Sequence, residues 1–256
     1  MEKLPTETNQ NGSVRALPRV ESAKLFIESW HVYRTVLENN DLAHITTIDR
    51  IAADIQKDGP RKIRLLDLGC GDGAIVSAVF DKLSAEGSAT CKLERYTGVD
   101  ASRAALELNT VKAVERELVE AELEAYLATT SSASLPSYDI ILANLILHHF
   151  EDPEAKRHLI QQITALLADG GRLYYGDVYA NEGEDRDDML RRWKPRMDEY
   201  RGLTLDERAS VWEHVFEKDY PSTQAFMGEI MVDGGLNVEV LADDGFYVCC
   251  LKGTKV

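Results

Sequence analysis

The chain has 256 residues, of which 44% are hydrophobic and 29% are charged, and its formal net charge is −15. This length suits one large α/β domain, which buries roughly 70–75% of the surface of its unfolded chain. Nucleic-acid binding is driven largely by Lys and Arg that neutralise phosphates, so the acidic balance argues against a nucleic-acid partner. No stretch approaches the ~18 uninterrupted apolar residues of a membrane span, which argues against a membrane partner.

The cysteines and the N-terminal residues indicate the cellular compartment of the protein. The four cysteines show no metal-ligand spacing, and we interpret them as reduced, mostly buried thiols of a cytoplasmic protein. Residues 1–20 are polar and contain no apolar h-region, which predicts a mobile tail rather than a signal peptide. The sequence predicts no metal site, and we expect a monomer or a homodimer.

Residues 21–58 have a helical pattern and are expected to form N-terminal cap helices. Aromatic and polar residues recur there at separations of 3 and 4, on one stripe if the helix is continuous: Trp30, Tyr33, Leu37, Asn40 and His44. Such a stripe suits the cover of a pocket, so Tyr33 and His44 are candidate substrate contacts. Alternatively, the aromatic residues only dock the helix, and the polar cluster at 39–41 breaks it and caps a second one.

Residues 65–73 are typical of a buried strand that runs into a loop with three alternating glycines. Glycine lacks Cβ and tolerates positive φ, so such a loop can bring its backbone amides against a ligand. Apolar residues at helical spacing follow, which predicts a helix whose N-terminus offers free N–H groups to an acidic group of the ligand. The spacing Gly-x-Gly-x-Gly is not the dinucleotide pattern, whose third glycine comes one residue later.

The next predicted strand covers residues 96–100 and ends in Asp100, at the sheet edge where open α/β folds bind ligands. A carboxylate at this place can accept hydrogen bonds from both hydroxyls of a ribose. A helix is expected over residues 101–114. Residues 118–123 alternate like a short edge strand, although their glutamates also suit a helix.

Residues 138–150 form an almost unbroken apolar run that ends in His148 and His149. Asp152 and Pro153 predict an N-cap and a first helical residue directly behind the pair. Adjacent side chains on a strand diverge, so at most one of the two histidines is expected to face a substrate. Residues 168–177 predict a glycine turn followed by another strand.

Residues 181–223 interrupt the alternation of strands and helices and are expected to form an inserted helical cap. Helices are predicted over residues 186–200 and, from the capping box that starts at Thr204, through residue 217. Ser222 is the predicted cap of a last helix that ends at residue 234 or 235. Two strands at 237–241 and 246–251 are separated by too few residues for a parallel crossover, which predicts an antiparallel pair.

In this order and spacing, the segments from residue 65 to residue 251 resemble the motifs of class I S-adenosylmethionine (SAM)-dependent methyltransferases of the small-molecule type. The resemblance implies a Rossmann-like, mostly parallel seven-stranded sheet with an antiparallel last strand and helices on both faces. The methyltransferase domain would cover residues 21–256, capped by the N-terminal helices and by the insertion after the fifth strand.

The resemblance also implies SAM as the cofactor. Backbone around Gly69 and Gly71 would meet its methionyl portion, and Asp100 would take its ribose. Asp67 would either orient the loop or bind the ammonium group, and Glu122 is either near the adenine or a solvated charge. The expected cofactor contacts are Asp67, Gly69, Cys70, Gly71, Asp100, Ala101, Glu122 and Asn144.

Methyl transfer is an in-line displacement, so holding the nucleophile at ~3–3.5 Å from the methyl carbon can supply much of the rate. A base is needed only for a protonated acceptor, and His148 or His149, with His149 favoured, is the candidate. Alternatively, the pair bonds to backbone and shapes the crevice. Trp193 and Arg196 are candidate acceptor contacts, or else a packing aromatic and a solvated charge.

Two other functions fit parts of the sequence. A non-catalytic SAM-binding subunit or sensor would keep the same loop. A nicotinamide-dependent oxidoreductase is compatible with the glycines and Asp100, although the missing third glycine at the required spacing weighs against it.

Overall fold

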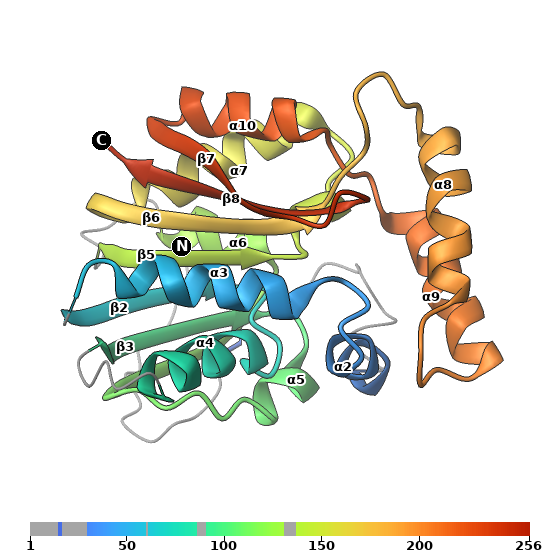
Figure 1. The fold of residues 1–256 in the computed structure, drawn as a ribbon. Coiled ribbons are helices and arrows are strands. Elements are labelled where there is room, and N and C mark those ends of the chain that lie inside the picture. The colour runs from blue at the N-terminus through green and yellow to red at the C-terminus, as the bar shows by residue number, and fades with distance from the viewer. Residues whose placement is uncertain (1–14, 17–29, 60, 86–90, 131–136) are drawn as a thin grey trace, which may run out of the picture.

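The computed structural model describes residues 15–16, 30–59, 61–85, 91–130 and 137–256. Their strands form one sheet in the order β1-β4-β3-β2-β5-β6-β8-β7 (Figure 1). The strands are β1 (Arg15–Ala16), β2 (Arg61–Leu68), β3 (Cys91–Asp100), β4 (Glu115–Glu120), β5 (Tyr138–Asn144), β6 (Leu167–Val178), β7 (Leu236–Asp243) and β8 (Val248–Lys255).

Neighbouring strands from β1 to β6 are parallel, and β8 runs antiparallel between β6 and β7. The predicted mostly parallel sheet with an antiparallel last strand is therefore confirmed. The two-residue β1 adds an eighth strand at one edge, within the segment predicted to be a mobile tail. The other residues of that segment lie outside the described ranges.

The helices are α2 (Trp30–Glu38), α3 (His44–Gln56), α4 (Ala74–Ala85), α5 (Arg103–Glu107), α6 (Leu123–Thr130), the 3-10 helix η1 (Leu147–His149), α7 (Pro153–Ala165), α8 (Arg186–Asp198), α9 (Leu205–Lys218) and α10 (Gln224–Asp233). One apolar core joins α3, α4 and α5 to one face of the sheet, and another joins α6, α7 and α10 to the opposite face. Within the described ranges, no helix combines the length and hydropathy needed to cross a bilayer.

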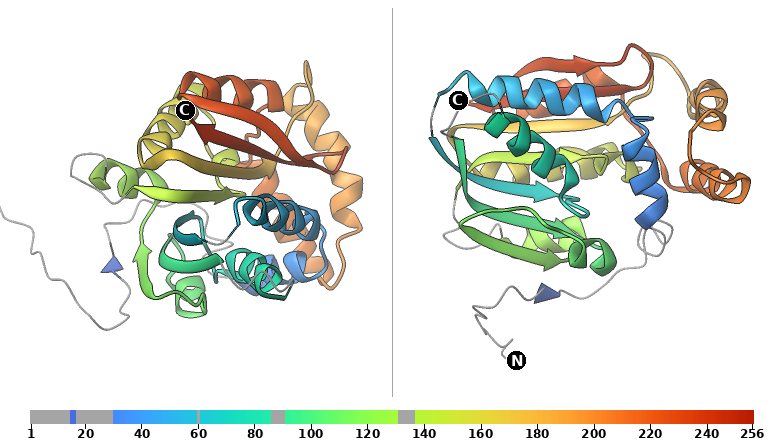
Figure 2. Two further views of the ribbon diagram at one scale, coloured as in Figure 1. Left: turned by 60° about the vertical axis from the view of Figure 1, so that its left-hand side comes forward. Right: turned by 60° about the horizontal axis from the view of Figure 1, so that its bottom comes forward.

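A third apolar core lies beyond the carboxyl ends of the parallel strands. It packs α2 against α8 and α9 through buried side chains that include Val36, Trp193 and Val211. Figure 1 shows α8 and α9 standing beside this end of the sheet near α2, and both views of Figure 2 show the same arrangement. These helices thus cover the sheet edge at which the glycine loop emerges.

Three local predictions need correction, and one alternative is confirmed. The helix expected over residues 101–114 covers only α5, whose N-cap is Ser102. The alternative for the N-terminal helix, a break at the polar cluster 39–41, is the one observed, because Asn40 and Ala43 have positive φ and the Asn40 side chain accepts a bond from the amide that follows His44. β5 ends at Asn144, and Leu145, at φ 53°, redirects the chain into η1. Thr223, one residue after the predicted cap Ser222, caps α10.

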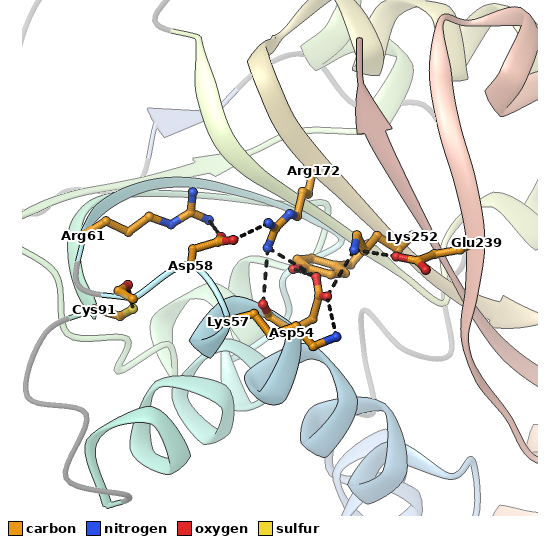
Figure 3. Close-up of polar contacts among 10 residues, drawn as sticks. Asp54, Lys57, Asp58, Arg61, Cys91, Arg172, Glu239 and Lys252 are labelled. Atoms are coloured by element: carbon orange, nitrogen blue, oxygen red, sulfur yellow. Dashed lines mark hydrogen bonds and ion pairs between the residues drawn. The ribbon is translucent and has the colours of Figure 1, made fainter.

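A buried carboxylate connects α3 to β6 and β8 at the end of the sheet away from the glycine loop (Figure 3). Asp54 is 3% exposed and accepts bonds from Lys252 Nζ at 3.1 Å and Arg172 Nη1 at 3.3 Å. The Tyr174 hydroxyl donates to it at 2.9 Å. Burial alone would raise the pKa of Asp54, but these partners hold it below its usual value. The carboxylate is therefore ionised and secures α3.

Candidate active site

A cavity of about 490 Å³ lies at the carboxyl ends of the parallel strands, beneath α2, α8 and α9. This volume is within the range of small-molecule sites, about 300–1,000 Å³. The glycine loop and the end of β3 line one part of it, and η1 with the C-terminal end of α9 lines another. One cavity therefore includes both predicted halves of the site.

Asp100 ends β3, and its carboxylate is oriented by backbone amides. Its Oδ2 accepts a bond from Gly71 N at 2.8 Å, and its Oδ1 accepts one from Ser102 N at 2.7 Å. Burial raises the pKa of Asp100, against the lowering effect of these two amides. An ionised carboxylate has about four acceptor positions, so each oxygen can take a further bond. Asp100 and the adjacent Ala101 both line the cavity.

Asp67, at the end of β2, lines the same part of the cavity and is 3% exposed. The Tyr96 hydroxyl donates to its Oδ2 at 3.1 Å. Burial raises the pKa of Asp67 to about 7, and the nearby Asp100 carboxylate adds to the rise. Near neutral pH, a cation placed beside Asp67 would therefore shift this carboxyl group toward its ionised form.

The glycine loop is pressed closely against α2. Gly71 has φ 53°, and a Cβ at this position would lie 2.1 Å from the Trp30 ring. Gly69 lines the cavity, whereas Gly71, predicted to contact the cofactor, does not line it, because the indole of Trp30 covers it. An ion pair between Arg34 and Asp72, which the sequence did not single out, holds α2 to the loop.

The other predicted cofactor residues line the cavity as well: Cys70, Glu122 and Asn144.

Of the predicted substrate residues on the N-terminal helices, Tyr33 lines the cavity and His44 does not. His44 is 2% exposed, and its Nε2 lies behind Tyr33, 3.4 Å from the hydroxyl. The break before α3 causes this difference, because it removes His44 from the stripe. Burial lowers the pKa of His44 to about 4, which leaves the ring neutral.

On α8 the residues that line the cavity are Trp193 and Met197, at helical spacing, and Tyr200 lines it from the segment that follows the helix. The predicted contact Trp193 is therefore brought to the cavity. Arg196 is not, since it lies on the exposed side of α8. Arg192, also on α8, pairs with Glu184 at 2.6 Å.

His148 is held by a buried carboxylate that ends β6. Its Nδ1 donates to Asp177 Oδ1 at 2.5 Å, and Asp177 is fully buried. Asp177 Oδ2 accepts bonds from the amides of Leu147 and His148 and from the Tyr175 hydroxyl. Burial lowers the pKa of His148, but the carboxylates of Asp177 and Asp219 outweigh it and raise the pKa overall. The ring orientation is therefore determined by Asp177.

His149 lies beside His148, with ring centroids 4.0 Å apart, and both rings line the cavity. The expectation that the two side chains diverge is wrong, because they lie on the tight turn of η1 and not on a strand. Burial and the neighbouring His148 lower the pKa of His149. His214 and Asp219, from α9 and its C-cap, line the cavity beside this pair.

The sequence did not indicate Asp177, His214 or Asp219. Asp177 lies near the end of a strand, as Asp100 does, and this position could have identified it from the sequence. The other two lie in an inserted segment with many charged residues, and no spacing connects them to His148.

The methyltransferase domain family matches residues 38–218, which cover the glycine loop, the strand ends and the inserted helices. The chain belongs to this family. This membership confirms the resemblance to class I SAM-dependent methyltransferases drawn from the sequence motifs.

Two curated relatives align with part of this chain. It is 30% identical over 118 residues to a ubiquinone biosynthesis O-methyltransferase of Alkalilimnicola ehrlichii, which is 46% of this chain and 42% of that one. It is 28% identical over 120 residues to an arsenite methyltransferase of Rattus norvegicus, which is 46% of this chain and 32% of that one. The chain thus spans less than half the length of these relatives.

The fold of this chain is similar to that of magnesium protoporphyrin IX methyltransferase from Synechocystis PCC 6803, solved with SAM bound. The TM-score is 0.57 at 14% identity, covering 91% of this chain and 94% of the other. Human N-acetylserotonin methyltransferase in complex with SAM gives a TM-score of 0.52 at 15% identity, covering 92% and 60%.

Proposed function

We propose that this protein transfers the methyl group of SAM to a small-molecule acceptor bound between the strand ends and helices α8 and α9. The observation that carries the proposal is the continuity of the cavity. The same space is lined by the glycine loop with Asp100 and by the paired histidines of η1. A donor held by the first group therefore has room to face an acceptor held near the second.

The residues at the glycine loop fit SAM. When bound, SAM supplies a methyl carbon already activated by a positive sulfur. Asp100 accepts the ribose hydroxyls, since the amides of Gly71 and Ser102 already fix its carboxylate. Asp67, ionised on contact, pairs with the ammonium group. The positive φ of Gly69 lets backbone approach the methionyl portion.

The acceptor end is mainly apolar and aromatic. Trp193 and Met197 of α8 and Tyr200 after it line this end, together with Val211 and Val215 of α9. Such a surface suits an acceptor with an apolar body, because burial of apolar area supplies about 25 cal/mol per Å². A nucleic-acid acceptor does not fit this lining or the net charge of −15.

His148 and His149 are polar groups at this end, next to His214 and Asp219. We place the acceptor hydroxyl, thiol or amine beside them, with His149 the favoured contact, where the pair lowers the cost of removing its proton. Asp177 keeps His148 in one orientation, and so the position of the contact is fixed before the acceptor binds. The rest of the rate comes from alignment of nucleophile and methyl carbon.

Thermal unfolding tests the cofactor assignment. S-adenosylhomocysteine at ~100 times its Kd adds about 2.7 kcal/mol of stability, which is roughly 5–10 °C in Tm for a domain of this size. NAD and NADP at the same concentrations should leave Tm unchanged. A shift with NADH and none with S-adenosylhomocysteine would contradict the proposal.

Transfer itself is tested by incubating the protein with methyl-labelled SAM and a small-molecule extract, followed by mass spectrometry of labelled products. With an acceptor identified, His149→Ala should lower kcat by about 10²-fold or more, with little change in SAM affinity. The matched control is His158→Ala, on the exposed side of α7. Cofactor binding without any labelled product would instead support a non-catalytic SAM-binding protein.

A further inference from the structure

Three imidazole nitrogens surround a single carboxylate oxygen at the acceptor end. Asp219 Oδ1 lies 3.4 Å from His149 Nδ1, 3.6 Å from His148 Nε2 and 3.6 Å from His214 Nε2. Asp219 is 5% exposed. Within the described part of the chain, neither its Oδ1 nor His149 Nδ1 has a hydrogen-bond partner. Buried polar atoms without partners are costly and rare, so this arrangement calls for a bound group.

The spacing of these atoms suits a metal ion. Ligands at ~2.0–2.1 Å from a tetrahedral zinc ion are about 3.4 Å from one another. The two distances from Asp219 Oδ1, 3.4 Å to His149 Nδ1 and 3.6 Å to His148 Nε2, are close to this separation. All three atoms lie within 4.8 Å of one another, so small side-chain rotations bring them around one ion.

The surroundings of His148 support the same assignment. Because its Nδ1–H is donated to Asp177, its Nε2 is the ring nitrogen that faces Asp219, and a metal ion bound there would displace any proton from it. A histidine that binds a metal almost always donates its other N–H to a carboxylate or carbonyl in this way. The backbone also joins the ligand segments, since Tyr220 N donates to His148 O at 2.6 Å. The residue after Asp219 is thereby fastened to η1.

We propose that His148 Nε2, His149 Nδ1 and Asp219 bind one divalent transition-metal ion, with zinc the best match to two imidazoles and one carboxylate. Catalytic zinc sites have three protein ligands and keep a fourth position open. Here that position faces the cavity, which all three residues line. His214 Nε2, from α9, lies at the same distance from the Asp219 oxygen as His148 Nε2.

The consequence for the reaction rests on the proposed function, whereas metal binding itself does not. An ion with an open position lowers the pKa of a hydroxyl or thiol that binds to it, so it would favour acceptors with one of these groups. The histidine pair would then act on the acceptor proton through the ion and not as a base. This departs from the absence of a metal site expected from the sequence.

Metal binding is measured on the full chain after dialysis against EDTA, by titration with Zn²⁺ in competition with a fluorescent zinc chelator. We expect one tightly bound ion per chain. His149→Ala and Asp219→Asn should each abolish this tight binding. Asp177→Asn, which leaves all three ligands in place, should raise the Kd for Zn²⁺ 10–100-fold. His31→Ala is the matched control, since His31 is exposed on α2, and should leave the Kd unchanged.

The wild-type titration decides the inference even where a variant folds poorly. Absence of a tightly bound ion in the wild type, or tight binding that survives both ligand substitutions, would overturn it. S-adenosylhomocysteine binding is measured on the same samples and should persist in His149→Ala. A wild type that binds S-adenosylhomocysteine normally but no zinc would refute only the metal site, whereas a wild type that binds zinc but not S-adenosylhomocysteine would refute only the proposed function.

Discussion

The raised pKa of Asp67 predicts a specific pH dependence of folding. In the unfolded chain this carboxyl titrates near its ordinary value of 3.8, and in the fold burial raises its pKa to about 7. Between these values the folded state holds a proton that the unfolded state has lost. The contribution of Asp67 to stability is therefore fully present below pH 3.8 and is lost as the pH rises through about 7.

The size of the effect follows from the pKa difference. Each pKa unit corresponds to about 1.36 kcal/mol, so the whole titration is worth roughly 4 kcal/mol. Roughly 2 kcal/mol of this is lost between about pH 5.5 and pH 8. Asp67→Asn cannot ionise and retains the bond from Tyr96. Urea unfolding should therefore show the variant gaining about 2 kcal/mol relative to wild type over this interval.

The same carboxyl should couple cofactor binding to pH. The ammonium group of S-adenosylhomocysteine favours ionised Asp67, so wild-type affinity should rise about 30-fold from pH 5.5 to pH 8, mostly below pH 7. Calorimetry on Asp67→Asn should show no such rise. Other titrating groups are common to both proteins and cancel in the comparison. Parallel stability profiles would refute the burial argument, and parallel affinity profiles would refute the ammonium contact.

Three further substitutions test other parts of the structure. Asp100→Asn removes charge-assisted bonds worth about 1.5–3 kcal/mol, so calorimetry should show S-adenosylhomocysteine affinity falling at least about tenfold with the fold intact; unchanged affinity would mean that Asp100 does not hold the ribose. Asp54→Asn leaves Lys252 without its buried partner and should lower the free energy of unfolding by about 3 kcal/mol. Urea unfolding measures this loss, and a loss below about 1 kcal/mol would contradict the ionised network. Gly71→Ala places a Cβ at positive φ against Trp30, so it should cost about 1–2 kcal/mol and change tryptophan fluorescence; a variant as stable as wild type with unchanged emission would show that the loop does not need glycine here.

The sequence by itself determined those features that depend on local backbone chemistry. The capping box at Thr204 and Glu207 and the Asp152 cap followed by Pro153 begin helices where predicted, because each satisfies nearby amides with its own side chain. The glycine loop followed from the spacing of its residues, and the antiparallel last pair followed from the short connection between its strands. Asp100 was identified for the same reason, since its place at a strand end is a local property.

Tertiary structure decided which distant side chains meet. Asp219 joins His148 only because the inserted helices fold back over the sheet edge, and residue spacing carries no information about that return. His44 was misplaced because a local break in the helix redirected it, and Arg196 because the apolar contacts of α8 turned it toward solvent. The acceptor end was therefore least predictable, since its residues come from segments whose relative position depends on packing against α2.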